Sequence, residues 1–259
     1  MAEQQFHDGQ VDARIVRREE VARDHVELIV ESPALARALP GQFAHILTPG
    51  MLRRPVSFSR IEPDGGRVGL LFQVVGEGTA WLANCQEGER LDILGPLGHG
   101  FAPPAPSRPW CLVGGGVGIP PLYSAAAQWR ESAPDVIIGA RTREWVLMHK
   151  DFEQLGLGVR VTTDDGSWGQ AGTVIGPLQE WLQNHADGQV FSCGPTPMLV
   201  AVASACRGRA TAQVALEQRM GCGIGACLAC VVPARGPTQM EYRRVCTEGP
   251  VFLAEELIW

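Results

Sequence analysis

Four cysteines near the end of the chain constrain its folding most strongly. They are Cys222, Cys227, Cys230 and Cys246, so the spacing is C-x4-C-x2-C, followed by a fourth cysteine after 15 intervening residues. Glycines surround the first two cysteines at Gly221, Gly223 and Gly225. Glycine adopts positive φ angles readily and lets the main chain approach an ion, while its amide can point toward a sulfur atom. We therefore expect a tight loop that gathers thiolates around a metal group.

Two kinds of metal group compete for these thiolates. The spacing resembles the plant-type [2Fe-2S] signature, in which four cysteines hold two irons. Structural zinc is the rival, because four cysteines also suit a tetrahedral ion, although zinc sites usually carry two C-x2-C pairs and this tail has one. Disulfide-bonded or simply buried cysteines fit less well, because four of the eight cysteines gather in this tail. We favour the iron–sulfur cluster, which would make the chain a carrier of single electrons.

Length and charge limit the alternatives. A chain of 259 residues with 45% hydrophobic residues can form two ordinary domains and a small appendage. A net charge of −6 argues against a nucleic-acid partner. No apolar run is long enough to predict a membrane span, and residues 1–8 lack the basic and apolar regions of a signal peptide. We expect a cytoplasmic protein, where metal-binding cysteines stay reduced.

The first part of the chain has the pattern of antiparallel strands. Hydrophobic residues alternate with other residues over 26–30 and again over 68–74, and turn-forming residues interrupt the runs at 63–66 and 76–78. Such short strands predict a small β-barrel domain over residues 1–103. The proline-rich stretch 103–109 then predicts a domain boundary.

The second part alternates strands with helices. Apolar strands are expected at 111–113, 136–140, 159–163 and 189–193, and helical stretches lie between and after them. This alternation predicts a doubly wound parallel sheet, an α/β domain over residues 108–211. The remaining tail, residues 212–259, has no helical periodicity and is too short for a large core, so we expect the metal site to organise it.

Small motifs in the barrel region predict an anion site. In Arg53–Ser59 a proline links an arginine to a serine, so that a guanidinium could hold a phosphate and a hydroxyl could hydrogen-bond a ring nitrogen. Downstream, Gly76–Ala80 offers bare amides at a possible helix start. Each motif alone is more typical of a turn. Together with Pro40–Phe43 and Gly95–Gly98, in this order, they form a specific set.

This set resembles the ferredoxin-reductase superfamily, whose barrel binds a flavin and whose second domain binds a nicotinamide nucleotide. Gly114–Gly118, after an expected strand, resembles the nucleotide-binding turn of that superfamily, although it departs from the usual G-x-G-x-x-G spacing. Cys193–Met198 resembles its C-G-P-x-x-M motif. The resemblance implies that NAD(P) is bound by the residues of these two turns, namely Gly114, Gly115, Gly116, Gly118, Cys193, Gly194 and Pro195.

The order of barrel, nucleotide domain and four-cysteine tail narrows the resemblance over almost the whole chain. It is similar to the electron-transfer subunits of two-subunit, NAD-dependent dihydroorotate dehydrogenases, and the stretch 245–252 is among the closest. The resemblance implies that FAD is bound by Arg54, Pro55, Val56, Ser57, Leu71, Phe72, Gln73, Gly78 and Thr79. It also implies a [2Fe-2S] cluster on the four tail cysteines and a partner subunit that carries FMN, with two copies of each subunit.

Other functions share this layout. An NAD(P)H–ferredoxin oxidoreductase or a sulfide dehydrogenase subunit is the alternative enzyme, and a zinc-binding adaptor without activity is the alternative of another class. Neither NAD nor NADP is favoured, because no residue is securely placed to contact the ribose 2′ position. No acid–base residue is expected, since the cofactors would make and break the bonds.

Overall fold

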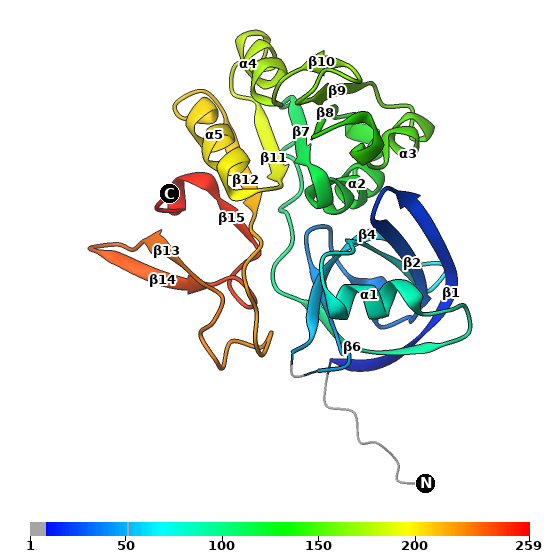
Figure 1. The fold of residues 1–259 in the computed structure, drawn as a ribbon. Coiled ribbons are helices and arrows are strands. Elements are labelled where there is room, and N and C mark those ends of the chain that lie inside the picture. Colours follow the sequence, from blue (N-terminus) through cyan, green and yellow to red (C-terminus); the bar gives the residue numbers. More distant parts are fainter. Residues whose placement is uncertain (1–8, 51) are drawn as a thin grey trace, which may run out of the picture.

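The computed structural model describes residues 9–50 and 52–259. The expectation about a signal peptide concerns residues 1–8 and lies outside the described residues. Figure 1 shows three parts: a barrel in blue and cyan, an α/β sheet in green and yellow, and a C-terminal part in orange and red that reaches back toward both.

The first part is a closed antiparallel barrel, as expected. Its six strands follow the order β1-β2-β5-β4-β3-β6, so every strand has two hydrogen-bonded neighbours. Alternate side chains of each strand point inward and fill a core that includes Leu28, Phe58 and Ile93. The strands are β1 (Gln10–Ala22), β2 (His25–Glu31), β3 (Phe43–Ile46), β4 (Arg54–Glu62), β5 (Arg67–Gln73) and β6 (Arg90–Leu97), and the helix α1 (Glu77–Asn84) lies between β5 and β6 in the chain.

The second part is a seven-stranded sheet in the order β10-β9-β8-β7-β11-β12-β15. All its pairings are parallel except that of β12 with β15. The strands β7 (Trp110–Gly115), β8 (Asp135–Ala140), β9 (Val159–Thr163) and β11 (Gln189–Cys193) confirm the expected βα alternation. The other elements are α2 (Ile119–Gln128), α3 (His149–Gln154), β10 (Gln170–Ala171), α4 (Ile175–Asn184), α5 (Thr196–Cys206), β12 (Thr211–Ala215) and β15 (Val251–Leu253).

The C-terminal part begins and ends in that sheet. It leaves the sheet after β12, forms the hairpin of β13 (Val231–Arg235) and β14 (Met240–Arg244), and returns as β15 (Figure 1). Its side chains Cys230, Val245 and Cys246 join the hydrophobic core beneath α4 and α5. The absence of helical periodicity in the tail agrees with the structure, because no α-helix follows α5 in the described residues.

No helix in the described part of the chain is both long and apolar enough to cross a membrane.

Candidate functional site

Two of the predicted flavin residues, Pro55 and Ser57, lie on the outward face of strand β4. In β4, Val56 and Phe58 point into the barrel core, so Pro55 and Ser57 at the alternate positions point away from it. Arg54 extends toward α1, and its Nη1 donates a hydrogen bond of 2.8 Å to the carbonyl of Leu52. Pro55 and Ser57 are both partly exposed and form a strip along β4 that a ligand can contact.

The start of α1 completes an anion-binding arrangement with Arg54. A Cβ atom on Gly78 would overlap the Arg54 guanidinium, so a side chain at this position would displace the guanidinium from the start of α1. Thr79 Oγ1 accepts hydrogen bonds from the amides of Val75 at 2.9 Å and Gly76 at 3.1 Å, which shapes the turn before the helix. A guanidinium beside the amides of a helix start suits the diphosphate of FAD.

The predicted residues of β5 do not share one orientation. Phe72 packs inside the barrel, whereas Leu71 packs on the opposite side, against the α/β domain. Gln73 ends the strand and is half-buried. Because the Phe72 side chain is inside the barrel, Phe72 can contact a ligand outside the barrel only through its main chain.

The two predicted nucleotide turns lie side by side. Gly114 in β7 is in register with Cys193 in β11, and a Cβ atom on Gly118 would overlap the carbonyl of Cys193. The turns therefore meet main chain to main chain at the carboxyl ends of adjacent parallel strands, where α/β sheets bind nucleotides. Desolvation raises the pKa of the Cys193 thiol to about 12, which leaves it uncharged at neutral pH.

The cysteine loop holds its thiols with main-chain amides. Gly223 and Gly225 have φ angles of +75° and +83°, which favour glycine. The sulfur of Cys222 accepts hydrogen bonds from the amides of Ala226 at 3.3 Å and Cys227 at 3.4 Å. Burial alone would raise the pKa of Cys222, but hydrogen bonds to its sulfur outweigh this and lower the pKa to about 7. Amide donors around a thiolate suit an anionic cluster.

The four thiols form two pairs. Cys222 and Cys227 exchange amide-to-sulfur hydrogen bonds, and the amide of Cys246 donates to the sulfur of Cys230 at 3.4 Å. All eight cysteines are free, so the disulfide alternative is wrong. Among the described residues, no three potential ligands converge as they would around a single ion. Two irons can each take one pair of thiolates, so these two pairs fit a [2Fe-2S] cluster.

Comparison with known proteins agrees with this geometry. Residues 217–258 match the family profile described as the iron-sulfur cluster binding domain of dihydroorotate dehydrogenase B. The chain is 40% identical to the dihydroorotate dehydrogenase B (NAD(+)) electron transfer subunit of Shouchella clausii, over 94% of this chain and 96% of that one. It is 39% identical to the protein of the same name from Geobacillus thermodenitrificans, over 96% and 99%. The chain belongs to this family.

Solved structures show the same fold. A structure titled as an NADH-dependent reduced ferredoxin-NADP oxidoreductase has a TM-score of 0.85 at 30% identity, covering 95% of this chain and 90% of that one. Phthalate dioxygenase reductase has a TM-score of 0.65 at 18% identity, covering 88% of both chains. The ferredoxin-reductase-like fold expected from the small motifs is thus confirmed for this member of the family.

The cysteine loop reaches the surface of the subunit. Cys227 is exposed, whereas Cys230 and Cys246 are buried. Two apolar side chains of the loop, Ile224 and Leu228, are 58% and 59% exposed. The cysteine loop therefore has one covered side and one exposed side.

A residue that the sequence analysis did not single out joins the barrel to this loop. His45 of β3 is fully buried, and a Cβ atom on Gly223 would lie 2.5 Å from its Nδ1. The histidines of the chain lack the paired spacing of metal ligands, so the sequence pattern carries no signal for His45. Phe43 of the same strand did have a sequence signal, because it belongs to the Pro40–Phe43 motif.

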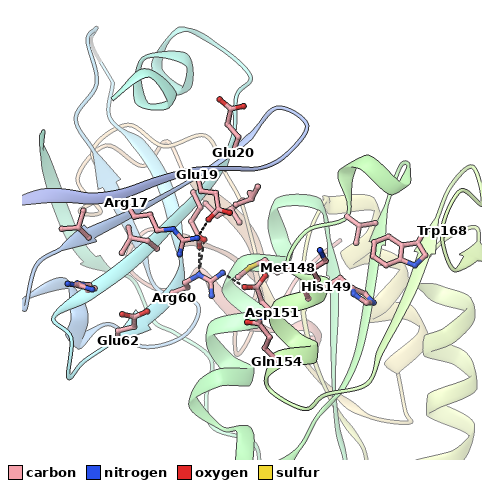
Figure 2. Close-up of a pocket in the computed structure, with 18 residues that line it drawn as sticks. Arg17, Glu19, Glu20, Arg60, Glu62, Met148, His149, Asp151, Gln154 and Trp168 are labelled. Atoms are coloured by element: carbon pink, nitrogen blue, oxygen red, sulfur yellow. Dashed lines mark hydrogen bonds and ion pairs between the residues drawn. The ribbon is translucent and has the colours of Figure 1, made fainter. Parts of the chain in front are cut away.

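A second unforeseen cluster joins the barrel to the α/β domain. It lies at a cleft of about 780 Å³ (Figure 2), where Arg60 donates hydrogen bonds to Glu27 at 3.1 Å and to Asp151 of α3 at 2.6 Å. Although burial would lower the pKa of Arg60, the charges of these carboxylates raise it. Of the predicted cofactor residues only Leu71 lines this cleft. The cleft is thus an interdomain seam held by ion pairs, away from the predicted cofactor strip.

Proposed function

We propose that this protein carries electrons from a dihydroorotate-oxidising partner subunit to NAD+. The observation that carries the proposal is the placement, on one chain, of a cysteine loop packed against strand β3 of the barrel, next to the β4 strip, with paired nucleotide turns on the adjoining sheet. A flavin exchanges two electrons with a nicotinamide and single electrons with an iron–sulfur cluster, which is the conversion such a pathway requires.

The chain's own residues would bind and orient these groups. We propose that FAD lies along β4 and the start of α1, at Arg54, Pro55, Val56, Ser57, Leu71, Phe72, Gln73, Gly78 and Thr79. NAD(P) would occupy the two turns at Gly114, Gly115, Gly116, Gly118, Cys193, Gly194 and Pro195. The cluster would be held by Cys222, Cys227, Cys230 and Cys246. Ser57 is the proposed hydrogen-bond partner near flavin N5.

The domain limits remain part of the proposal: residues 1–103 for FAD, 108–211 for the nucleotide and 212–259 for the cluster. Strand β12 crosses the second limit, because it pairs with β11 throughout its length. The tail would therefore depend on the sheet of the nucleotide domain for its attachment.

The exposed side of the cysteine loop is the proposed contact with the partner. Ile224 and Leu228 project from it, and Tyr242 of the adjacent hairpin is 63% exposed. Exposed apolar side chains around a redox site suit a protein partner more than solvent. We propose that this partner is an FMN-containing catalytic subunit, that the complex holds two copies of each chain, and that it is cytoplasmic.

Co-purification tests the proposal. The complex isolated with a tagged version of this chain should contain FAD, FMN and iron, and should reduce NAD+ with dihydroorotate. A colourless protein with one zinc and no flavin would overturn the proposal. The similarity to the ferredoxin-NADP oxidoreductase structure favours a second candidate, a subunit of an NAD(P)H–ferredoxin oxidoreductase. That candidate, or a sulfide dehydrogenase subunit, would be supported by a stable partner that resembles a glutamate-synthase flavoprotein.

A further inference from the structure

His45 occupies an unusual place on the barrel. Its neighbours in β3, Ala44 and Ile46, point into the barrel core, so His45 and Phe43 point outward. An outward side chain of a barrel is normally in contact with solvent, but His45 is 0% exposed. It is covered by the cysteine loop, where Gly223 faces its Nδ1 and the main chain of Cys222 lies beside the ring.

The same residue adjoins the proposed flavin strip. His45 is directly opposite Pro55 in the β3–β4 register, and Phe43 is opposite Ser57. Side chains at opposite positions on one face of an antiparallel pair lie about 5 Å apart. Phe43 in turn packs in the same core as Cys230 and Cys246. These two side chains of β3 therefore separate the strip on β4 from the cysteine loop.

Hydrogen bonding gives the His45 ring little support. Neither ring nitrogen has a partner of good hydrogen-bond geometry among the described residues, although main-chain groups of Arg53 and Cys222 lie near the ring. The ring is therefore held mainly by packing. Its contact with Gly223 is by packing alone, and the absence of a side chain at residue 223 makes that contact possible.

We propose that His45 is a positioning residue for electron transfer: its ring holds Cys222–Gly223 at a fixed separation from strand β4. This inference rests on the proposed function, because it presumes a cluster on the loop and a flavin on the strip. Transfer of an electron between two groups slows steeply as their separation grows. The separation that this contact sets would therefore affect the rate of transfer.

A double-mutant cycle tests the contact. His45→Ala removes the ring, and Gly223→Ala places a Cβ atom against it, so each change displaces the loop from β4. In the intact complex, each should slow reduction of the cluster by NADH several-fold, because electron transfer slows steeply with the separation of the two groups. The double variant should be no slower than Gly223→Ala alone, because the ring that the new methyl group strikes is gone.

Gly225→Ala is the matched control. Gly225 has a similar positive φ angle, but its added Cβ would meet Thr247 rather than His45. The Gly225→Ala substitution should slow cluster reduction by the same factor in the wild-type and in the His45→Ala background. Stopped-flow absorbance gives the rates, and the electron paramagnetic resonance line shape of the reduced cluster reports displacement of the loop. Iron and flavin contents show that each variant is loaded.

Two results would overturn the inference. One is a fully loaded His45→Ala complex whose cluster is reduced at the wild-type rate. The other is strictly multiplicative effects of His45→Ala and Gly223→Ala, with the same multiplicative result for the Gly225→Ala control. Failure of the proposed function looks different, because the wild-type protein itself would then lack iron, lack flavin or fail to oxidise NADH.

Discussion

The barrel and the cysteine loop differ in what orders their proposed sites. Every barrel strand has two hydrogen-bonded neighbours, and Arg54, Ser57 and Gly78 are placed by that scaffold. Residues 216–230, by contrast, contain no helix or strand between β12 and β13. Their order comes from positive-φ glycines and amide-to-sulfur hydrogen bonds. A flavin site of this kind exists before its ligand arrives, whereas the cluster site depends on the metal for much of its order.

The largest expected difference between the two regions comes from removing one thiol. Cys227→Ser replaces the exposed member of the first thiol pair, a proposed cluster ligand, and we expect electron flow between FAD and the partner subunit to be abolished. Direct reduction of a dye by NADH through FAD should remain largely intact, since the barrel does not use the loop for its own order. Loss of the dye activity without loss of flavin would show that the proposed order of carriers is wrong.

Removing the metal should have the next largest effect, because it should change hydrogen exchange in the loop and not in the barrel. In cluster-free protein we expect amide hydrogen exchange to become much faster over residues 216–230, because weak hydrogen bonds to sulfur would be the main protection left. The amides of β2 and β5 should exchange as before. Equal protection of the loop with and without iron, measured by mass spectrometry, would show that the protein alone orders it.

A change in the proposed anion site tests whether the barrel is already arranged to bind FAD. Arg54→Ala should weaken FAD binding by about 1.5–3 kcal/mol, the contribution of a charged hydrogen bond, with little change in iron content. Equilibrium dialysis of the apoprotein with FAD measures this. Arg14→Ala is the control, because Arg14 is an exposed barrel arginine whose pair with Glu31 lies on the surface, and it should bind FAD normally.

The smallest effect concerns how the barrel is held against the α/β domain. Two ion pairs cross this seam: Arg60 with Asp151, about a quarter exposed on both sides, and Arg23 with Glu144, about two thirds exposed. Asp151→Ala should lower the free energy of unfolding by about 1–2 kcal/mol, because it leaves a partly buried guanidinium short of a partner. Glu144→Ala should cost less than about 1 kcal/mol. Equal effects in chemical denaturation would mean that burial does not distinguish the pairs.

Local patterns predicted most of the fold and of the candidate site. The alternation over residues 68–74 became β5, the glycines at 76–78 mark the start of α1, and the C-x4-C spacing produced the pair of Cys222 and Cys227. In each of these cases the residues that interact are close in the chain, so their spacing carries the information.

Contacts between distant segments could not be predicted in this way. His45 meets Gly223, and Arg60 meets Asp151, only because the barrel, the sheet and the tail pack together. A lone histidine in a strand and a lone arginine near a strand end have no periodicity that marks them. The return of the tail as β15 beside β12 also depends on tertiary packing, since its three residues are too few to form a strand pattern.

The pairing of β12 with β15 has a consequence for how such a chain can be rebuilt. The chain leaves the sheet at Ala215 and rejoins it at Val251, and these two residues are opposite each other in register. The segment between them thus leaves and rejoins the sheet at positions that face each other. A short hairpin turn from Ala215 to Val251 would therefore keep the β12–β15 register, but it would remove Cys230, Val245 and Cys246 from the core that they share with α4 and α5.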